Sequence, residues 1–246
     1  MQPLLNSARC LLAALLLLTA GPSLAANAST VAGLLVYRVE EPKSAPHISR
    51  ILVTDEYLRM DQGGGSDDTG FVLYDRGQQT IYSVDHEAKR VLGMQATGNQ
   101  PETPANLLLS ERAFEPDDAP ELSGGRPLGY QLFANEHLCT RLIAAPGLMS
   151  NALEGLREFR TALAEQQAES LVGLPAEMTS PCDLAIHVYA PVRDLQYGLP
   201  LEVNDPGGRQ LLVDFRPDFA ADPALFRLPE GYSRLSMDQI RGGFGP

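Results

Sequence analysis

The sequence predicts a mainly β protein of the α+β class, built as a single domain, and three observations predict it. Apolar and polar residues alternate through residues 31–95 and again after residue 181, which is the period of half-buried strands. The turns between the early runs are short and polar, so neighbouring strands can only be antiparallel. One segment, 148–170, instead repeats its apolar residues at intervals of three and four, as an amphipathic helix does.

The first residues predict a secretory signal peptide. Arg9 precedes an apolar run from Cys10 to Ala20, and small residues at Ser23 and Ala25 fit cleavage after about Ala25. The run is roughly half of the ~20 residues that a spanning helix needs, which argues against a membrane anchor. Cys10 precedes the run instead of following it, which argues against a lipoprotein signal. We therefore expect an exported, periplasmic domain, residues 26–246, with no transmembrane anchor.

The composition is acidic. The 246 residues hold 19 Lys and Arg against 31 Asp and Glu, for a net charge of −12. Loss of residues 1–25 removes Arg9 and no acid, so the remaining chain is more acidic still. Such a surface argues against binding to nucleic acid or to anionic membranes.

Two cysteines, Cys139 and Cys182, remain after the signal peptide is removed. In an exported protein the simplest interpretation is a disulfide, which would stabilise the fold by about 4 kcal/mol in the chain-entropy model. A pair of free thiols or a redox pair is the alternative, although the separation is far from Cys-x-x-Cys.

The early strands are expected at 34–39, 47–53, 57–61, 71–74, 80–84 and 90–94. A glycine-rich loop at 63–68 and turns at 75–77 and 85–87 separate them. The first strand carries an apolar face made of Leu35, Tyr37 and Val39. The pattern is that of a β-meander.

Residues 97–127 form an acidic, proline-rich stretch that predicts a long loop, with one helical turn at 106–112. Strands are expected to resume at 130–133 and 138–144. The helix over about 148–170 presents apolar residues on one face and Glu154, Arg157, Glu158, Arg160 and Glu165 on the other. Further strands are predicted at 184–188, 199–203 and 210–215, with a Pro-Gly turn at 204–208.

No catalytic constellation is apparent, so we do not expect an enzyme. The four histidines are scattered, and only His137 and Cys139 share a strand face, so no metal site or cofactor is expected. The 61–68 segment has glycines where a calcium loop needs acids. Ser66 and Ser123 lie near glycines but outside a nucleophile elbow.

Two stretches of the chain resemble known families. The first resembles the periplasmic lipoprotein-carrier (LolA/LolB-like) superfamily, and its residues are Ser49-Arg50-Ile51, Met60-Asp61, Gly70-Phe71-Val72-Leu73-Tyr74-Asp75, Thr80-Ile81-Tyr82-Ser83-Val84 and Lys89-Arg90-Val91. The second is similar to the ending of the uncharacterised exported DUF4412 group, and its residues are Gly198-Leu199-Pro200-Leu201 and Leu225-Phe226-Arg227-Leu228-Pro229-Glu230-Gly231-Tyr232. The resemblance implies an incomplete antiparallel β-barrel with an apolar concave face and a helical lid.

An open half-barrel of this kind predicts a cavity for a hydrophobic ligand, such as a lipid, an acyl chain or a lipoprotein-like peptide. The residues expected to line it are Leu35, Tyr37, Val39, Val72, Tyr74, Tyr82 and Val84, closed by Leu153, Leu156, Phe159 and Leu163 of the helix. The strand aromatics could equally be ordinary core. The alternative function is a partner-binding or envelope-stress sensing module without a small ligand, with the 97–127 loop as its contact to an envelope protein.

Overall fold

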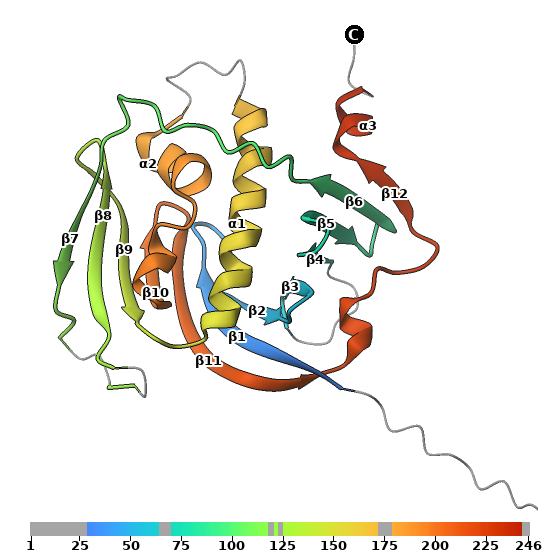
Figure 1. The fold of residues 1–246 in the computed structure, drawn as a ribbon, viewed down its shortest axis with the longest axis horizontal. Coiled ribbons are helices and arrows are strands. Elements are labelled where there is room, and N and C mark those ends of the chain that lie inside the picture. Colours follow the sequence, from blue (N-terminus) through green and yellow to red (C-terminus); the bar gives the residue numbers. More distant parts are fainter. Residues whose placement is uncertain (1–28, 64–69, 118–120, 123–124, 172–178, 243–246) are drawn as a thin grey trace, which may run out of the picture.

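In the computed structural model, the described residues (29–63, 70–117, 121–122, 125–171 and 179–242) are organised around one twelve-stranded sheet (Figure 1). Its order is β12-β6-β5-β4-β3-β2-β1-β11-β10-β9-β8-β7. All neighbours are antiparallel except β12 and β6, which are parallel. The predicted signal peptide, residues 1–25, and most of the glycine-rich loop lie outside the described residues.

The strands are β1 (Thr30–Glu40), β2 (His47–Val53), β3 (Tyr57–Asp61), β4 (Phe71–Asp75), β5 (Thr80–Asp85), β6 (Arg90–Gln95), β7 (Leu109–Phe114), β8 (Leu128–Ala134), β9 (His137–Ala145), β10 (Leu199–Asp205), β11 (Gly208–Ala221) and β12 (Ser233–Ser236).

The sheet curves around helix α1 (Ser150–Leu171) and stays open (Figure 1). Strands β7 and β12 are its two edges, so the described strands do not close into a barrel. This confirms the predicted fold class, a mainly β, incomplete barrel with a helical cover in a single domain. No helix among the described residues has the length and apolar character needed to span a membrane.

The inner face of the sheet, defined as the face that α1 covers, carries the largest hydrophobic cluster. Leu35, Tyr37 and Ile51 from the strands pack there against Leu153 and Phe159 of α1. Burial of this apolar surface is the main stabilising term for the helix and the sheet together.

The outer face carries a second cluster that the C-terminal segment covers. Phe71 and Val84 are paired across β4 and β5 and point to this face, whereas the pair Tyr74 and Ile81 of the same two strands points to the inner face. Phe226, from the short helical turn η4 (Pro223–Phe226), completes the outer cluster. The C-terminal segment therefore belongs to the fold, and its strand β12 was not anticipated from the sequence.

Polar contacts fix α1 at several points along its length, and two of them involve its glutamates. Arg76, in the β4–β5 turn, donates from Nε and Nη2 to the two carboxylate oxygens of Glu158 at 2.7 and 2.8 Å. Glu165 is only 5% exposed and accepts hydrogen bonds from the backbone N–H groups of Thr97 and Gly98 at 2.8 and 2.9 Å. The prediction that Glu165 lies on a solvent face is wrong, because the loop after β6 reaches the helix there.

The predicted helical turn at 106–112 is also wrong. Residues 109–114 form the edge strand β7, which pairs with β8 from Leu109↔Ala134 to Phe114↔Gly129. The hydrogen-bonding edge of β8 outweighs the local helix propensity of this leucine-rich segment. Part of the predicted loop 97–127 is therefore sheet.

The predicted strand at 184–188 is helical instead. Helix α2 (Pro181–Leu184) runs directly into the π-helical turn η2 (Ala185–Tyr189). Ser180 caps the start by accepting a hydrogen bond from Asp183 N at 3.0 Å, and Pro181 occupies the first helical position. These start signals override the alternation of apolar residues.

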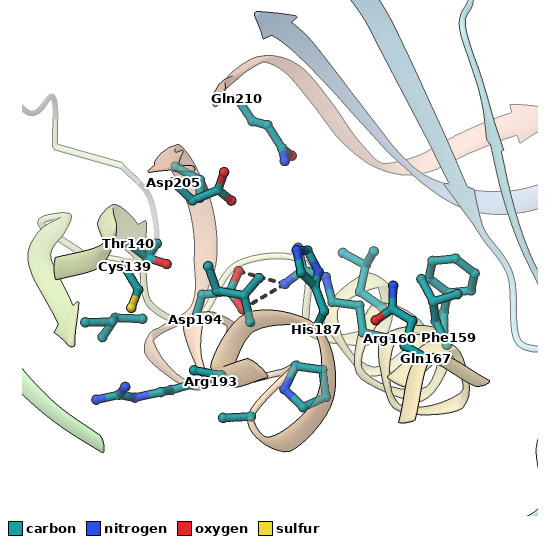
Figure 2. A pocket seen from close by; sticks show the side chains of 18 of the residues that line it. Cys139, Thr140, Phe159, Arg160, Gln167, His187, Arg193, Asp194, Asp205 and Gln210 are labelled. Atoms are coloured by element: carbon teal, nitrogen blue, oxygen red, sulfur yellow. Dashed lines mark hydrogen bonds and ion pairs between the residues drawn. The ribbon is translucent and has the colours of Figure 1, made fainter. Parts of the chain in front are cut away.

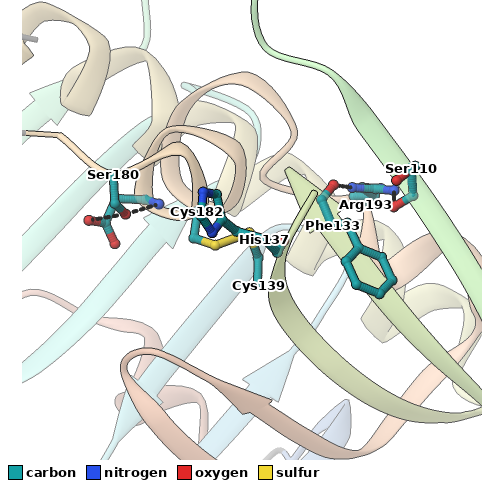
Figure 3. The surroundings of a disulfide bond; sticks show 8 residues. Ser110, Phe133, His137, Cys139, Ser180, Cys182 and Arg193 are labelled. Atoms are coloured by element: carbon teal, nitrogen blue, oxygen red, sulfur yellow. Dashed lines mark hydrogen bonds between the residues drawn. A yellow bond between two sulfur atoms is a disulfide. The ribbon is translucent and has the colours of Figure 1, made fainter. Parts of the chain in front are cut away.

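The predicted disulfide between Cys139 and Cys182 is present and joins β9 to α2 (Figure 3). Both cysteines are buried in a small cluster with Leu107, Ala134 and Ala185. The bridge therefore holds the helical segment that follows α1 against the sheet.

We expect loss of this bridge to lower the free energy of unfolding by about 4 kcal/mol, because it closes a sequence separation of 43 residues. Denaturant unfolding of the oxidised protein and of the Cys139→Ser, Cys182→Ser double variant measures the difference. A loss of less than about 1 kcal/mol would contradict a stabilising role for the bridge.

We expect Glu165→Ala to destabilise the fold by about 2 kcal/mol, because it removes a buried carboxylate that accepts from the backbone N–H groups of Thr97 and Gly98. The matched control is Glu154→Ala, at an exposed position of the same helix, which should change stability by no more than about 0.5 kcal/mol. Equal losses in thermal or denaturant unfolding would show that Glu165 has no special role.

Candidate functional site

A cavity of about 270 Å³ lies between the middle of α1, from Leu156 to Gln167, the turn η2 and the inner face of the sheet (Figure 2). Helix α1 packs on strands β1, β2, β3 and β5, and it also packs against η2. The cavity is the space that these elements leave between them.

Most of the cavity wall is apolar. Strands β2, β3 and β8 contribute Ile51, Met60 and Leu132, and three residues of α1 face them across the space. Those helix residues are Leu156, Phe159 and Leu163. A wall of this kind favours an apolar ligand group over water.

An ion pair between Arg160 of α1 and Asp194 lies in the cavity wall (Figure 2). Nη1 of Arg160 lies 2.7 Å from each carboxylate oxygen of Asp194, which begins the 3₁₀ turn η3 (Asp194–Tyr197). The side chain of Asp194 is 13% exposed and that of Arg160 is 30% exposed. The prediction that Arg160 lies on a solvent face of the helix is therefore wrong.

Asp205 lies on another side of the cavity, at the end of β10 (Figure 2). Its Oδ1 accepts a hydrogen bond from Gly207 N at 2.7 Å. The turn requires glycine at 208, where φ is +134° and a Cβ atom would lie 2.2 Å from the carbonyl oxygen of Glu40. This backbone geometry holds Asp205 in place at the cavity.

Tyr37 and Arg193 are two further polar groups of the wall, and both form hydrogen bonds within the protein. The Tyr37 hydroxyl donates to the carbonyl oxygen of Pro200 at 3.0 Å. Burial raises the pKa of Tyr37 well above its usual range, so the phenol stays neutral. Arg193 donates to the carbonyl oxygens of Phe133 and Ser110, which fixes the segment after η2 to the edge of the sheet.

Four of the residues expected to line a cavity do so, namely Tyr37, Leu156, Phe159 and Leu163. Leu35, Tyr74 and Leu153 instead belong to the packed inner cluster, and Val39 and Val72 pack against that cluster. The cavity therefore involves fewer residues of the sheet than predicted, because α1 packs directly on much of the concave face.

The other two predicted positions, Tyr82 and Val84, lie on the outer face. In β5 they alternate with Ile81 and Ser83, so they point away from α1. The prediction places Val72 and Val84 on the same face of the sheet. The observed register pairs Val72 with Ser83, so Val84 lies on the opposite face from Val72.

Sequence reasoning missed the polar groups of the cavity. His187 lies in the segment 184–188 that alternation predicts as a strand, Asp194 follows that segment, and Asp205 lies in the predicted turn at 204–208. The Ser180-Pro181 helix start was the available signal that the 184–188 segment covers the sheet instead of joining it.

Among the described residues, no group of three or more His, Cys, Asp and Glu side chains is arranged to hold a metal ion. Cys139, which shares its strand with His137, is committed to the disulfide.

Comparison with known proteins gives only distant similarity. No protein-family model matches the chain, and no curated protein matches it. An uncharacterised conserved protein from Thermus thermophilus aligns over 85% of this chain and 92% of its own, with 11% identity and a TM-score of 0.41. PNGF-II aligns over 87% of this chain and 33% of its own, with 8% identity and a TM-score of 0.38. At these scores neither similarity bears on function.

The environment of Asp205 generates a prediction about stability. Burial raises the pKa of this carboxyl and Asp194 raises it further, against the turn N–H groups of Gly207 and Gly208 and the nearby His187, which lower it. A carboxyl whose pKa is higher in the folded state binds its proton more tightly when folded. Its ionisation therefore removes stability as the pH rises from the unfolded value of about 4 through the folded value.

We expect Asp205→Asn to be at least as stable as the wild type at pH 7, with the difference vanishing below about pH 4. Asparagine keeps an oxygen acceptor for the turn but does not ionise. Urea unfolding at several pH values checks this, with Asp218→Asn on an exposed position of β11 as the control. A variant less stable than the wild type by more than about 1 kcal/mol at pH 7 would contradict the prediction.

Proposed function

We propose that the protein is an exported, periplasmic binding or carrier protein that holds a hydrophobic ligand in the cavity beside α1. The observation that carries the proposal is the cavity itself, whose apolar wall is formed by Ile51, Met60, Leu132 and three residues of α1. The signal-peptide pattern at residues 1–25 supports export, and the disulfide agrees with an oxidising compartment.

The size of the cavity limits what it holds. About 270 Å³ is just below the range of roughly 300–1,000 Å³ that is usual for pockets of drug-sized ligands. A short acyl chain, or the end of a longer one, suits this space better than an entire two-chain lipid. The open sheet with its helical cover supports a further proposal, that the chain belongs to the LolA/LolB-like superfamily and lies near its DUF4412 group.

A second candidate function is the binding of a protein partner, and edge strand β7 favours it. The strand has a free edge in the sheet order, and Leu108 just before it and Leu109 at its start are 68% and 36% exposed. Such an edge can accept a further strand from a partner. Strand β7 contributes no residue to the cavity wall, so filling the cavity distinguishes the two functions.

We expect Leu163→Trp to abolish ligand binding while the fold persists. Leu163 is partly buried at the cavity wall, so the larger ring enters open space instead of a packed core. Titration with decan-1-ol below its aggregation limit should show at least about a tenfold loss of affinity, equivalent to about 1.4 kcal/mol. Native mass spectrometry of protein purified from periplasm should show the loss of any co-purified ligand.

The matched control is Leu138→Trp, on a half-exposed position of β9 that does not line the cavity. It should bind like the wild type. Unchanged binding in Leu163→Trp, or no binding by the wild type, would count against the carrier function and leave the partner-binding function as the explanation of the fold.

A further inference from the structure

We infer that the cavity selects hydrophobic molecules that end in a primary ammonium group, and that Asp205 recognises this group. The inference rests on the proposed function, since it names the class of ligand that the same cavity takes. It follows from the charged side chains in and beside the cavity wall. Arg160 and Arg193 each have a carboxylate next to them, whereas Asp205 forms no ion pair with an arginine or lysine among the described residues.

The Arg160–Asp194 pair is neutral as a unit. Both oxygens of Asp194 approach the same nitrogen of Arg160, at 2.7 Å. A carboxylate ligand that reached for the remaining N–H groups of Arg160 would approach Asp194 as well. Arg160 is therefore a poor anchor for an anion, because part of its attraction is already used.

Arg193 does not change this balance. Its donors go to the carbonyl oxygens of Phe133 and Ser110, and Glu111 lies 3.9 Å from its Nη2 atom. Its guanidinium therefore bonds to the backbone at the edge of the sheet and has a carboxylate beside it. The positive charge is matched before a ligand arrives.

Asp205 is the charge that remains. Within the described part of the chain its hydrogen bonds come from backbone N–H groups of its own turn, and no cationic side chain forms an ion pair with it. The nearest arginine in sequence, Arg209, is bonded to Glu202 at 3.2 Å. His187, on η2, is the basic group that faces it across the cavity.

A partly buried carboxylate without a cation, beside an apolar wall, fits a ligand with an apolar chain and a cationic end. The chain would lie along Phe159 and Leu163, and the ammonium would donate hydrogen bonds to Asp205 and to the amide oxygen of Gln210 from the adjacent strand (Figure 2). The net charge of −12 adds a long-range attraction for cations.

The test uses three probes with the same chain and different ends: decylamine, decan-1-ol and decanoate. They are titrated into the mature, disulfide-bonded protein at about pH 8, where a primary amine is still protonated and the carboxylate is ionised. We expect decylamine to bind about fivefold or more tightly than decan-1-ol, and decanoate to bind most weakly.

Variants assign the preference to Asp205. Asp205→Asn should bring decylamine and decan-1-ol within about twofold of each other, whereas Asp205→Glu and the control Asp218→Asn should keep the preference. Leu163→Trp should lose decylamine binding, which separates the cavity from general attraction of amines to an acidic surface.

Equal affinity for the three probes, or tighter binding of decanoate, would overturn the inference and leave the proposed function standing. Decylamine binding that survives Leu163→Trp would also overturn it. Failure of all three probes to bind the wild type would overturn both the inference and the proposed function. If a variant does not fold, the order of the three probe affinities in the wild type alone decides whether the inference holds.

Discussion

Helix α1 lies across the concave face of a sheet that does not close on itself, and the rest of the structure depends on that contact. An open, curved sheet exposes an apolar inner face unless another element covers it. Leu153, Leu156 and Phe159 provide the cover, and Glu158 and Glu165 fix the helix to the β4–β5 turn and to the loop after β6. Because these contacts come from separate parts of the sheet, the helix is held against rotation as well as against separation.

The position of the cavity follows from the same constraint. Leu156, Phe159 and Leu163 of α1 form one side of the cavity, and η2 and the inner face of the sheet form the others. The Cys139–Cys182 bridge determines how closely the α2–η2 segment approaches the sheet. A cavity bounded by a fixed helix and a cross-linked turn is largely formed before a ligand arrives, which reduces the entropy that binding must offset.

The sequence predicted the strands well because alternation and turn residues agree with each other from β2 to β6, where every boundary falls within one residue. It failed where two local signals disagree. At 184–188 the alternation favoured a strand, but the Ser180 cap and Pro181 set a helix first. It also failed where tertiary contacts decide, because the helical period that placed Arg160 and Glu165 towards solvent carries no information about Asp194 or the 97–98 backbone. Four of the eleven predicted residues therefore line the cavity, whereas its strand residues Ile51, Met60 and Leu132 and its charged groups were not predicted.

Asp205 shows why that polar half matters. A fold optimised only for stability would pair this carboxylate or replace it, since burial without a cation opposes its ionisation. Its neighbours Gly207 and Gly208 stabilise the charge through backbone hydrogen bonds, but they contribute no positive charge. The Arg160–Asp194 pair, in contrast, is complete within the protein and needs nothing from a ligand. The two carboxylates of the cavity thus have different roles. Asp194 stabilises the fold through Arg160, whereas Asp205 is less favourable for the empty fold and remains able to attract a cationic ligand.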